Sequence, residues 1–238
     1  MRRAGFLVTA ALMIGAVVPA PAGAIVGGAS TGAGSWPWVV QVFNTSGPRH
    51  CGGALVAPTR VVTAGHCVDG GPPSSTFVVA NDKVTLSGSS AVIGVSSVEF
   101  APSYAPGTST DVAVLTLDSA PVPATTLQVL GAGDSADFAN PASGQIAGWG
   151  TTGSIGSIPP NLLQGTVTLD TVGADCIFGT RCSETGVEPC NGDIGDPVIV
   201  QIGADTVTSD PSPANGEWRL VAVPVALDSI CTGATYAT

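Results

Sequence analysis

The stretch Thr63-Ala64-Gly65-His66-Cys67 follows a β-rich run and sets one of the two histidines of the chain beside a cysteine. It decides the fold once four other segments are considered with it. In sequence order these are Ile25-Val26-Gly27-Gly28, Asp111-Val-Ala-Val-Leu-Thr-Leu117, Gly148-Trp149-Gly150 and Cys190-Asn-Gly-Asp-Ile-Gly-Asp-Pro197. Each segment alone is a weak signal, so their joint order carries the argument.

Charge is scarce in this chain and mostly negative. Its 238 residues include 7 Lys+Arg against 17 Asp+Glu, for a net charge of -10, together with 32 Gly and 19 Pro. So few basic residues argue against nucleic-acid binding, which needs Lys and Arg to neutralise phosphates. The low charge also excludes a coiled coil, and the 44% of hydrophobic residues argues against disorder. The length suits one large all-β domain or two small ones.

Residues 1–24 have the pattern of an export signal. Met1-Arg2-Arg3 is basic, residues 4–18 form an apolar run too short to span a bilayer comfortably, and Ala22-Gly23-Ala24 suits signal-peptidase cleavage. An uncleaved membrane anchor is the alternative. Cleavage would make Ile25 the first residue and leave residues 25–238 as an acidic, secreted protein that does not contact a membrane.

All six cysteines follow this leader, which favours three disulfides formed in an oxidising compartment. They are Cys51, Cys67, Cys176, Cys182, Cys190 and Cys231. Their pairing is open from the sequence alone. Metal binding is the rival interpretation, but the chain has no paired C-x-x-C motif and only two histidines. We therefore expect no metal and no organic cofactor.

The rest of the chain consists of short β-rich runs separated by Gly, Pro, Ser and Asn. The runs cover residues 39–43, 77–79, 84–86, 92–95, 111–117, 163–169 and 198–202. No stretch has a sustained helical period. The residues by themselves predict an exported, disulfide-bonded, all-β sandwich or barrel.

In their order, the five segments resemble those of the chymotrypsin/trypsin-like serine peptidases. The resemblance implies two six-stranded antiparallel β-barrels packed face to face, barrel 1 over about residues 25–130 and barrel 2 over about 131–238. It weakens after about Leu220, and the terminal helix of the family has no counterpart. It also implies the disulfides Cys51–Cys67, Cys176–Cys182 and Cys190–Cys231.

The same resemblance assigns His66 as the general base and Asp111 as the carboxylate that orients it, although either could be merely structural. The family motif Gly-Asp-Ser-Gly-Gly-Pro appears here as Gly192-Asp193-Ile194-Gly195-Asp196-Pro197. Ile194 has no lone pair to attack a carbonyl and no proton for His66 to accept, so covalent acyl transfer is excluded at this position. The backbone N–H groups of Gly192 and Ile194 still suit an oxyanion hole. Ser183 and Thr63 are poorly placed to replace the missing hydroxyl.

Other departures lie near the same site. Asp196 stands where the family has a glycine, and Val225-Ala226-Leu227 replace the Ser-Trp-Gly pocket edge. Glu188 falls near the pocket floor, where an acid would select Arg or Lys, although a surface role is an equal interpretation. Because the departures cluster, lost proteolysis explains them better than a single sequence error does.

The sequence therefore predicts a secreted, monomeric trypsin-like homologue without catalysis, retained for binding an unidentified protein or peptide, or encoded by a decaying gene. One alternative is an active serine endopeptidase in which Ile194 is an isolated lesion or error. Another is an unrelated secreted β-sandwich that binds a ligand. A calcium loop after His66 would have only Asp69 and Asp82 as acids and stays unassigned.

The resemblance also pairs a newly formed Ile25 α-amino group with the Asp193 carboxylate. We expect the N-terminal sequence of the secreted protein, measured by Edman degradation or mass spectrometry, to begin at Ile25. Removing either partner of this buried ion pair should cost roughly 3–5 kcal/mol of stability. Secreted protein that begins at another residue would contradict the pairing.

Overall fold

The computed structural model describes residues 25–31, 34–46, 49–80, 91–131, 142–151, 159–169, 187, 189–202, 217–227 and 234–237. Several sequence predictions fall outside these ranges. They concern the leader at 1–24, the run at 84–86, Asp82, Cys176, Cys182, Ser183, Glu188 and Cys231.

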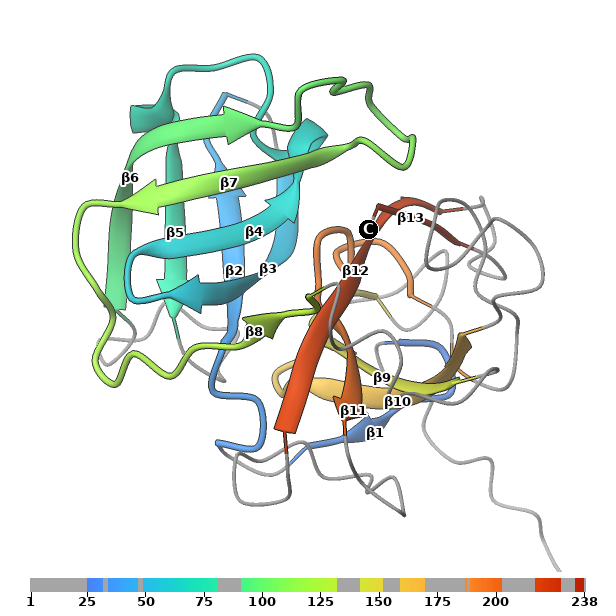
Figure 1. The fold of residues 1–238 in the computed structure, drawn as a ribbon. Helices are drawn as coiled ribbons and strands as arrows, with labels where there is room; N and C mark the ends of the chain where they lie inside the picture. Colours follow the sequence, from blue (N-terminus) through green and yellow to red (C-terminus); the bar gives the residue numbers. More distant parts are fainter. Residues whose placement is uncertain are drawn as a thin grey trace, which may run out of the picture.

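Six strands in the first half of the chain close into a barrel, in the order β2-β3-β4-β7-β6-β5 (Figure 1). Each of the six neighbouring strand pairs in the barrel runs antiparallel. The strands are β2 Val39–Asn44, β3 Arg49–Ala57, β4 Arg60–Ala64, β5 Thr76–Ala80, β6 Ala91–Phe100 and β7 Val112–Leu117. Closure leaves this sheet without a free edge.

A seven-stranded sheet ordered β1-β10-β9-β11-β12-β13, with β8 pairing with β12, is formed by the second half together with β1 from near residue 30. Its strands are β1 Ala29–Ser30, β8 Gln128–Val129, β9 Ala142–Gly148, β10 Leu163–Leu169, β11 Val198–Ile202, β12 Glu217–Leu227 and β13 Ala234–Ala237. The predicted all-β, two-part architecture is confirmed, with seven strands in the second sheet where six were expected. β8 lies parallel to β12, and the other pairs in the sheet are antiparallel.

The helical elements in the described ranges are two short 3₁₀ turns, η1 Gly65–Cys67 and η2 Pro73–Ser75. In that part of the chain, no helix has the length and apolar character that crossing a bilayer requires.

Strand β7 illustrates why these sequences form a barrel. Alternate residues Ala113, Leu115 and Leu117 are buried, and the residues between them are partly exposed. A period of two sends one set of side chains to the barrel interior and the other outward. The same alternation explains why Asp111, one residue before the strand, belongs with the inward set and is fully buried.

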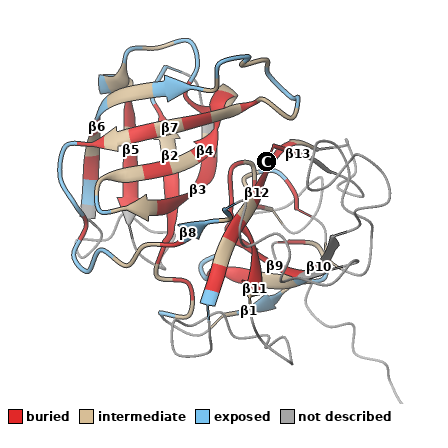
Figure 2. Ribbon diagram, in the orientation of Figure 1, coloured by how far each residue is buried: buried red, intermediate tan, exposed pale blue. Residues whose placement is uncertain are grey.

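One apolar cluster joins the two halves, and Figure 2 colours buried residues in both of them. It contains Leu55 and Leu115 of the barrel together with Trp149 and Ile199 of the second sheet. Polar links cross the same boundary, since the Trp36 indole N–H donates to Gln164 Oε1 at 2.7 Å. The two halves are therefore held at a defined angle.

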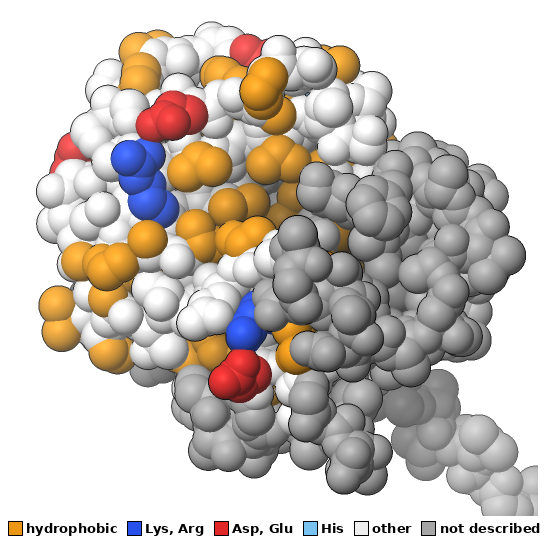
Figure 3. All heavy atoms as spheres, in the orientation of Figure 1, with side chains coloured by type: hydrophobic (Ala, Val, Ile, Leu, Met, Phe, Trp, Pro, Cys, Tyr) orange, Lys and Arg blue, Asp and Glu red, His pale blue; other side chains and the backbone are white. Residues whose placement is uncertain are grey.

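An apolar hollow of about 290 Å³ opens where the barrel meets the second sheet, and hydrophobic side chains gather on the face drawn in Figure 3. Val62 and Val112 line it from the barrel, and Val129 and Leu220 line it from the sheet. Two basic side chains in the described ranges pair with neighbouring acids, Arg60 with Glu99 at 2.9 Å and Arg219 with Glu217 at 2.9 Å.

We predict that Leu115→Ala will lower the free energy of unfolding by about 2–5 kcal/mol, because it opens a cavity in a fully buried site. Val92→Ala serves as the control, since Val92 is an apolar residue on β6 with 57% of its surface exposed. Urea denaturation measures both variants. Equal losses for the two would contradict the burial of Leu115.

Candidate active site

His66 is held by the junction between strand β4 and the turn η1. The Cys51–Cys67 disulfide, with sulfurs 1.97 Å apart, ties the residue after His66 to strand β3, as the resemblance implied. The residue before it, Gly65, donates its N–H to the Asp111 carbonyl at 3.1 Å. A side chain at Gly65 would collide with the Tyr104 ring, so this close packing requires glycine.

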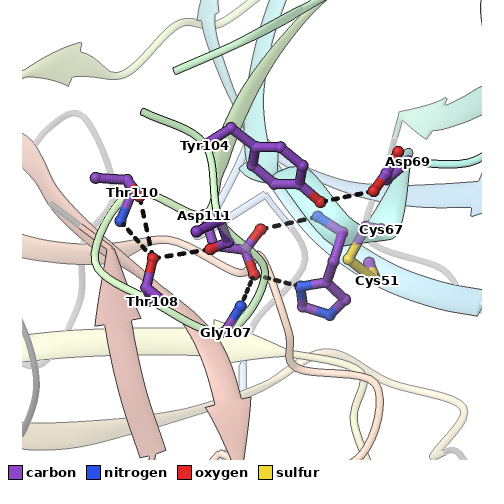
Figure 4. A network of polar contacts seen from close by, with 10 residues as sticks. Cys51, Cys67, Asp69, Tyr104, Gly107, Thr108, Thr110 and Asp111 are labelled. Atoms are coloured by element: carbon purple, nitrogen blue, oxygen red, sulfur yellow. Dashed lines mark hydrogen bonds and ion pairs between the residues drawn. A yellow bond between two sulfur atoms is a disulfide. The ribbon is translucent and has the colours of Figure 1, made fainter. Parts of the chain in front are cut away.

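The structure brings His66 and Asp111 together in a two-point contact (Figure 4). Asp111 Oδ2 lies 2.7 Å from His66 Nδ1, and Asp111 Oδ1 accepts the His66 backbone N–H at 2.8 Å. The Gly107 N–H adds a third hydrogen bond to Oδ2 at 2.6 Å. The imidazole is therefore oriented by a carboxylate that is itself fixed in place.

Burial and hydrogen bonding act in opposite directions on Asp111. Burial by itself raises the pKa, but hydrogen bonds from the His66 side chain and from the Gly107 and His66 N–H groups outweigh it, and the pKa is lowered from 3.8. Asp111 is consequently ionised at neutral pH. A buried carboxylate in this position stabilises the positive charge that His66 would gain on accepting a proton.

The turn from Cys190 to Pro197 packs against the strands that lead to His66. The Gly52 N–H on β3 donates to the Ile194 carbonyl at 2.7 Å, and the Gly195 N–H donates to the Pro224 carbonyl at 2.8 Å. Gly195 has a φ of 85°, and a side chain there would strike the Gly52 carbonyl and Thr63 Oγ1. The turn therefore depends on glycine both for its backbone conformation and for its close approach to β3 and β4.

Ile194 occupies the centre of this turn and is partly exposed. Its side chain packs against the apolar cluster shared by the two halves, and it offers no group that could attack a carbonyl. Thr63 does not supply the missing hydroxyl, because its Oγ1 is fully buried and donates to the Gly52 carbonyl at 2.7 Å.

The predicted oxyanion-hole donors, the N–H groups of Gly192 and Ile194, lie on this turn. Gly192 has a φ of 103°. No carbonyl among the described residues accepts either N–H group. Two such donors on one turn are suited to hold a carbonyl or carboxylate oxygen.

Asp193 and Ile25 meet in the interior behind the turn, and both are fully buried. Asp193 accepts the Gly150 N–H at 2.6 Å, the Cys190 N–H at 2.8 Å and also the Ile25 N–H. Burial raises the pKa of Asp193 from 3.8 to about 6, although these hydrogen bonds oppose the increase. The structure thus places the two residues of the expected N-terminal pair in contact.

A cavity of about 550 Å³ lies beside His66. Asp69 and Gly107 line it from the barrel, and Val225 lines it from strand β12. The predicted pocket edge Val225-Ala226-Leu227 lies at the end of β12, where Ala226 pairs with Thr235 of β13. No group of three His, Cys, Asp or Glu residues in the described ranges could hold a metal ion.

Comparison with known proteins now identifies this arrangement. A family model described as Trypsin matches residues 25–230. The chain belongs to the trypsin family. It is 33% identical over 196 residues to a trypsin of Saccharopolyspora erythraea, which covers 78% of this chain and 86% of that protein. It is also 33% identical to trypsin alpha-4 of Lucilia cuprina over 197 residues, 77% of this chain and 75% of that one.

Sequence reasoning missed three contributors to this trypsin-family site. Gly107 fixes Asp111 from within the loop before β7, and the turn-forming pair Pro106-Gly107 was the available sequence signal. Tyr104 covers Gly65 and donates its hydroxyl to Asp69 at 3.0 Å. The Gly52 N–H binds the Ile194 carbonyl on the turn from Cys190 to Pro197, which we call the nucleophile turn after its predicted role. Only the folded arrangement of the two halves reveals this contact. The second cysteine pair lies outside the described ranges, and Cys190 is disulfide-bonded.

We predict that Asp111→Asn will lower stability by about 2 kcal/mol at pH 7, because it removes a charged hydrogen-bond acceptor from a buried site. The folded pKa of Asp111 is lowered, so its contribution is present above pH 3.8 and is lost as the pH falls through the folded value. The difference in the free energy of unfolding between wild type and variant should therefore become smaller in acid. Urea denaturation from pH 7 downward measures this difference.

The control for this experiment is Asp118→Asn, which removes an exposed carboxylate directly after β7. Its effect should be small at every pH. The stability difference between wild type and Asp111→Asn could instead stay constant down to the pH at which the wild type unfolds. That result would contradict the assignment of Asp111 as the ionised partner of His66.

Proposed function

We propose that this trypsin-family protein is an exported, non-catalytic homologue whose cleft binds a peptide or protein without cleaving it. The observation that carries the proposal is Ile194, which stands at the nucleophile position of a site whose other parts are assembled. His66 and Asp111 are joined at 2.7 Å, and the donors of the oxyanion hole are open. The site can orient a carbonyl, but it has no group with which to form an acyl-enzyme.

If the proposal is correct, the loss of catalytic rate relative to a complete triad is large. Removing the nucleophile from a Ser-His-Asp triad lowers kcat on the order of 10⁶-fold. The rate enhancement that remains comes from the oxyanion hole and from substrate binding. His66 could still activate a water molecule. Unlike a serine hydroxyl, however, that water molecule is not bonded to the protein chain and is not fixed at the attacking position. We therefore expect binding, with at most very slow hydrolysis.

Export and cleavage before Ile25 are supported by the backbone around that residue. Ile25 has a φ of 56°, which a β-branched residue adopts only under strain. This torsion includes the carbonyl carbon of Ala24, so cleavage between the two residues would abolish it. The resulting α-ammonium group would lie where the Ile25 N–H already donates to Asp193.

The experiment that tests the proposal is labelling with a fluorophosphonate probe, which reacts with an activated serine. We expect no labelling of the wild type and weak labelling of Ile194→Ser, because Asp196 and the altered pocket edge remain. The double variant Ile194→Ser/Asp196→Gly should label more strongly, since it restores two motif positions at once. Hydrolysis of casein, followed in parallel, should rank the proteins in the same order.

His66→Ala in the Ile194→Ser background is the matched control, and it should abolish whatever labelling that variant shows. Labelling of the wild type that depends on His66 would overturn the proposal. Full activity of Ile194→Ser alone would mean that Ile194 is an isolated lesion in an otherwise active serine endopeptidase.

A further inference from the structure

Two carboxyl groups converge in the interior behind the nucleophile turn. Asp193 and Asp196 both have 0% of their surface exposed. A side chain at Gly148 on β9 would collide with oxygens of both residues, so the two carboxyls approach the same point from one side of the turn. Asp196 also fills the space beside Gly52 on β3, where a side chain would strike its Oδ1.

The two carboxyls differ in their hydrogen-bond partners. Asp193 accepts N–H groups from Gly150 and Cys190. Neither oxygen of Asp196 receives a hydrogen from any N–H or O–H group of the described residues. The polar group that Asp196 does approach is the Asp193 carboxyl, since Asp196 Oδ2 and Asp193 Oδ1 would both meet a side chain at Gly148. Two ionised carboxylates only accept hydrogen bonds, so a hydrogen bond between them requires a proton on one of them, and Asp193 is the one whose charged form the N–H groups stabilise.

Apart from the α-ammonium group that cleavage before Ile25 would add beside Asp193, no positive charge among the described residues faces Asp196 from the surrounding elements. β3 and β9 present the backbone of Gly52 and Gly148. His50 lies on the other side of the turn against Gly192, where its Nε2 is 2.9 Å from Gln41 Oε1. The N-terminal segment offers the Ile25 N–H to Asp193. Asp193 is therefore the charged group that Asp196 meets.

We propose that Asp196 is a neutral carboxylic acid that donates its proton to the Asp193 carboxylate, and that the turn carrying Ile194 is a pH-sensitive element held by this shared proton. While the pair keeps one proton, a single hydrogen bond joins the two carboxyls. When the proton leaves, two like charges are confined in the same buried space and repel each other. The turn then loses its packing against Gly52.

The direction of the pH dependence follows from the burial of Asp196. Burial, the charge of Asp193 and the hydrogen bond to it all raise the pKa of Asp196 well above 3.8. A raised folded pKa means that the folded protein keeps a proton that the unfolded chain releases. The stability that Asp196 contributes is therefore fully present in acid and is lost as the pH rises above 3.8 and through the folded pKa.

The experiment compares the unfolding equilibrium of wild type, Asp196→Asn and Asp118→Asn by urea denaturation between about pH 6.5 and 8.5, above the range in which the partly buried His50, whose pKa is lowered by desolvation, gains a proton. One proton released on unfolding changes the unfolding constant about tenfold per pH unit. The wild type and the exposed control Asp118→Asn should both show this roughly tenfold change per pH unit in addition to any other pH dependence of unfolding. Asp196→Asn keeps a hydrogen-bond donor to Asp193 but has no proton to release, so it should lack this additional pH dependence.

Equal slopes for wild type and Asp196→Asn would overturn the proposal. If Asp196→Asn does not fold, the wild type alone decides the question through ¹³C NMR titration of its aspartate carboxyl carbons. One aspartate should remain protonated at pH 7, and full ionisation of all aspartates in the folded protein would refute the shared proton. The proposal does not rest on the absence of catalysis, so probe labelling of the wild type would leave it standing.

Discussion

The close approach of the nucleophile turn to strand β3 is the contact on which the rest of the site depends. The Gly52 N–H donates to the Ile194 carbonyl at 2.7 Å, and Gly195 fits against Gly52 and Thr63 where a side chain would collide. This contact joins the second sheet to the barrel at the position where β4 delivers His66. Without it the two halves could share an apolar core, but the turn and the histidine would not form one site.

Three fully buried carboxyls surround this contact in a chain that has few charges, and each is satisfied in a different way. Asp111 is ionised because hydrogen bonds from His66 and Gly107 outweigh burial. Asp193 relies on backbone N–H groups and meets Ile25. Asp196 has no donor in its surroundings and needs a proton of its own. The cost of an unpaired buried charge explains why these solutions differ.

The orienting part of the site and its reactive part are structurally separable. His66 and Asp111 are held by the barrel alone, through the Cys51–Cys67 disulfide and the loop before β7. Ile194 belongs to a turn whose hydrogen bonds use backbone atoms. Replacing the side chain at 194 therefore leaves the dyad and the open donors of the turn in place. This separation is what the proposed binding without cleavage requires of the fold.

The sequence by itself determined the all-β class and the family, because these follow from local motifs and from a period of two. The runs at 163–169 and 198–202 match β10 and β11, but β3, β9 and β12 were missed because their Gly, Ala and Pro content hides the alternation. Only the tertiary structure decided that Asp196 lies against Asp193 and Gly52, since segments far apart in the chain build that space. A buried carboxyl is charged or neutral according to its neighbours, and no local pattern reveals which neighbours folding will supply.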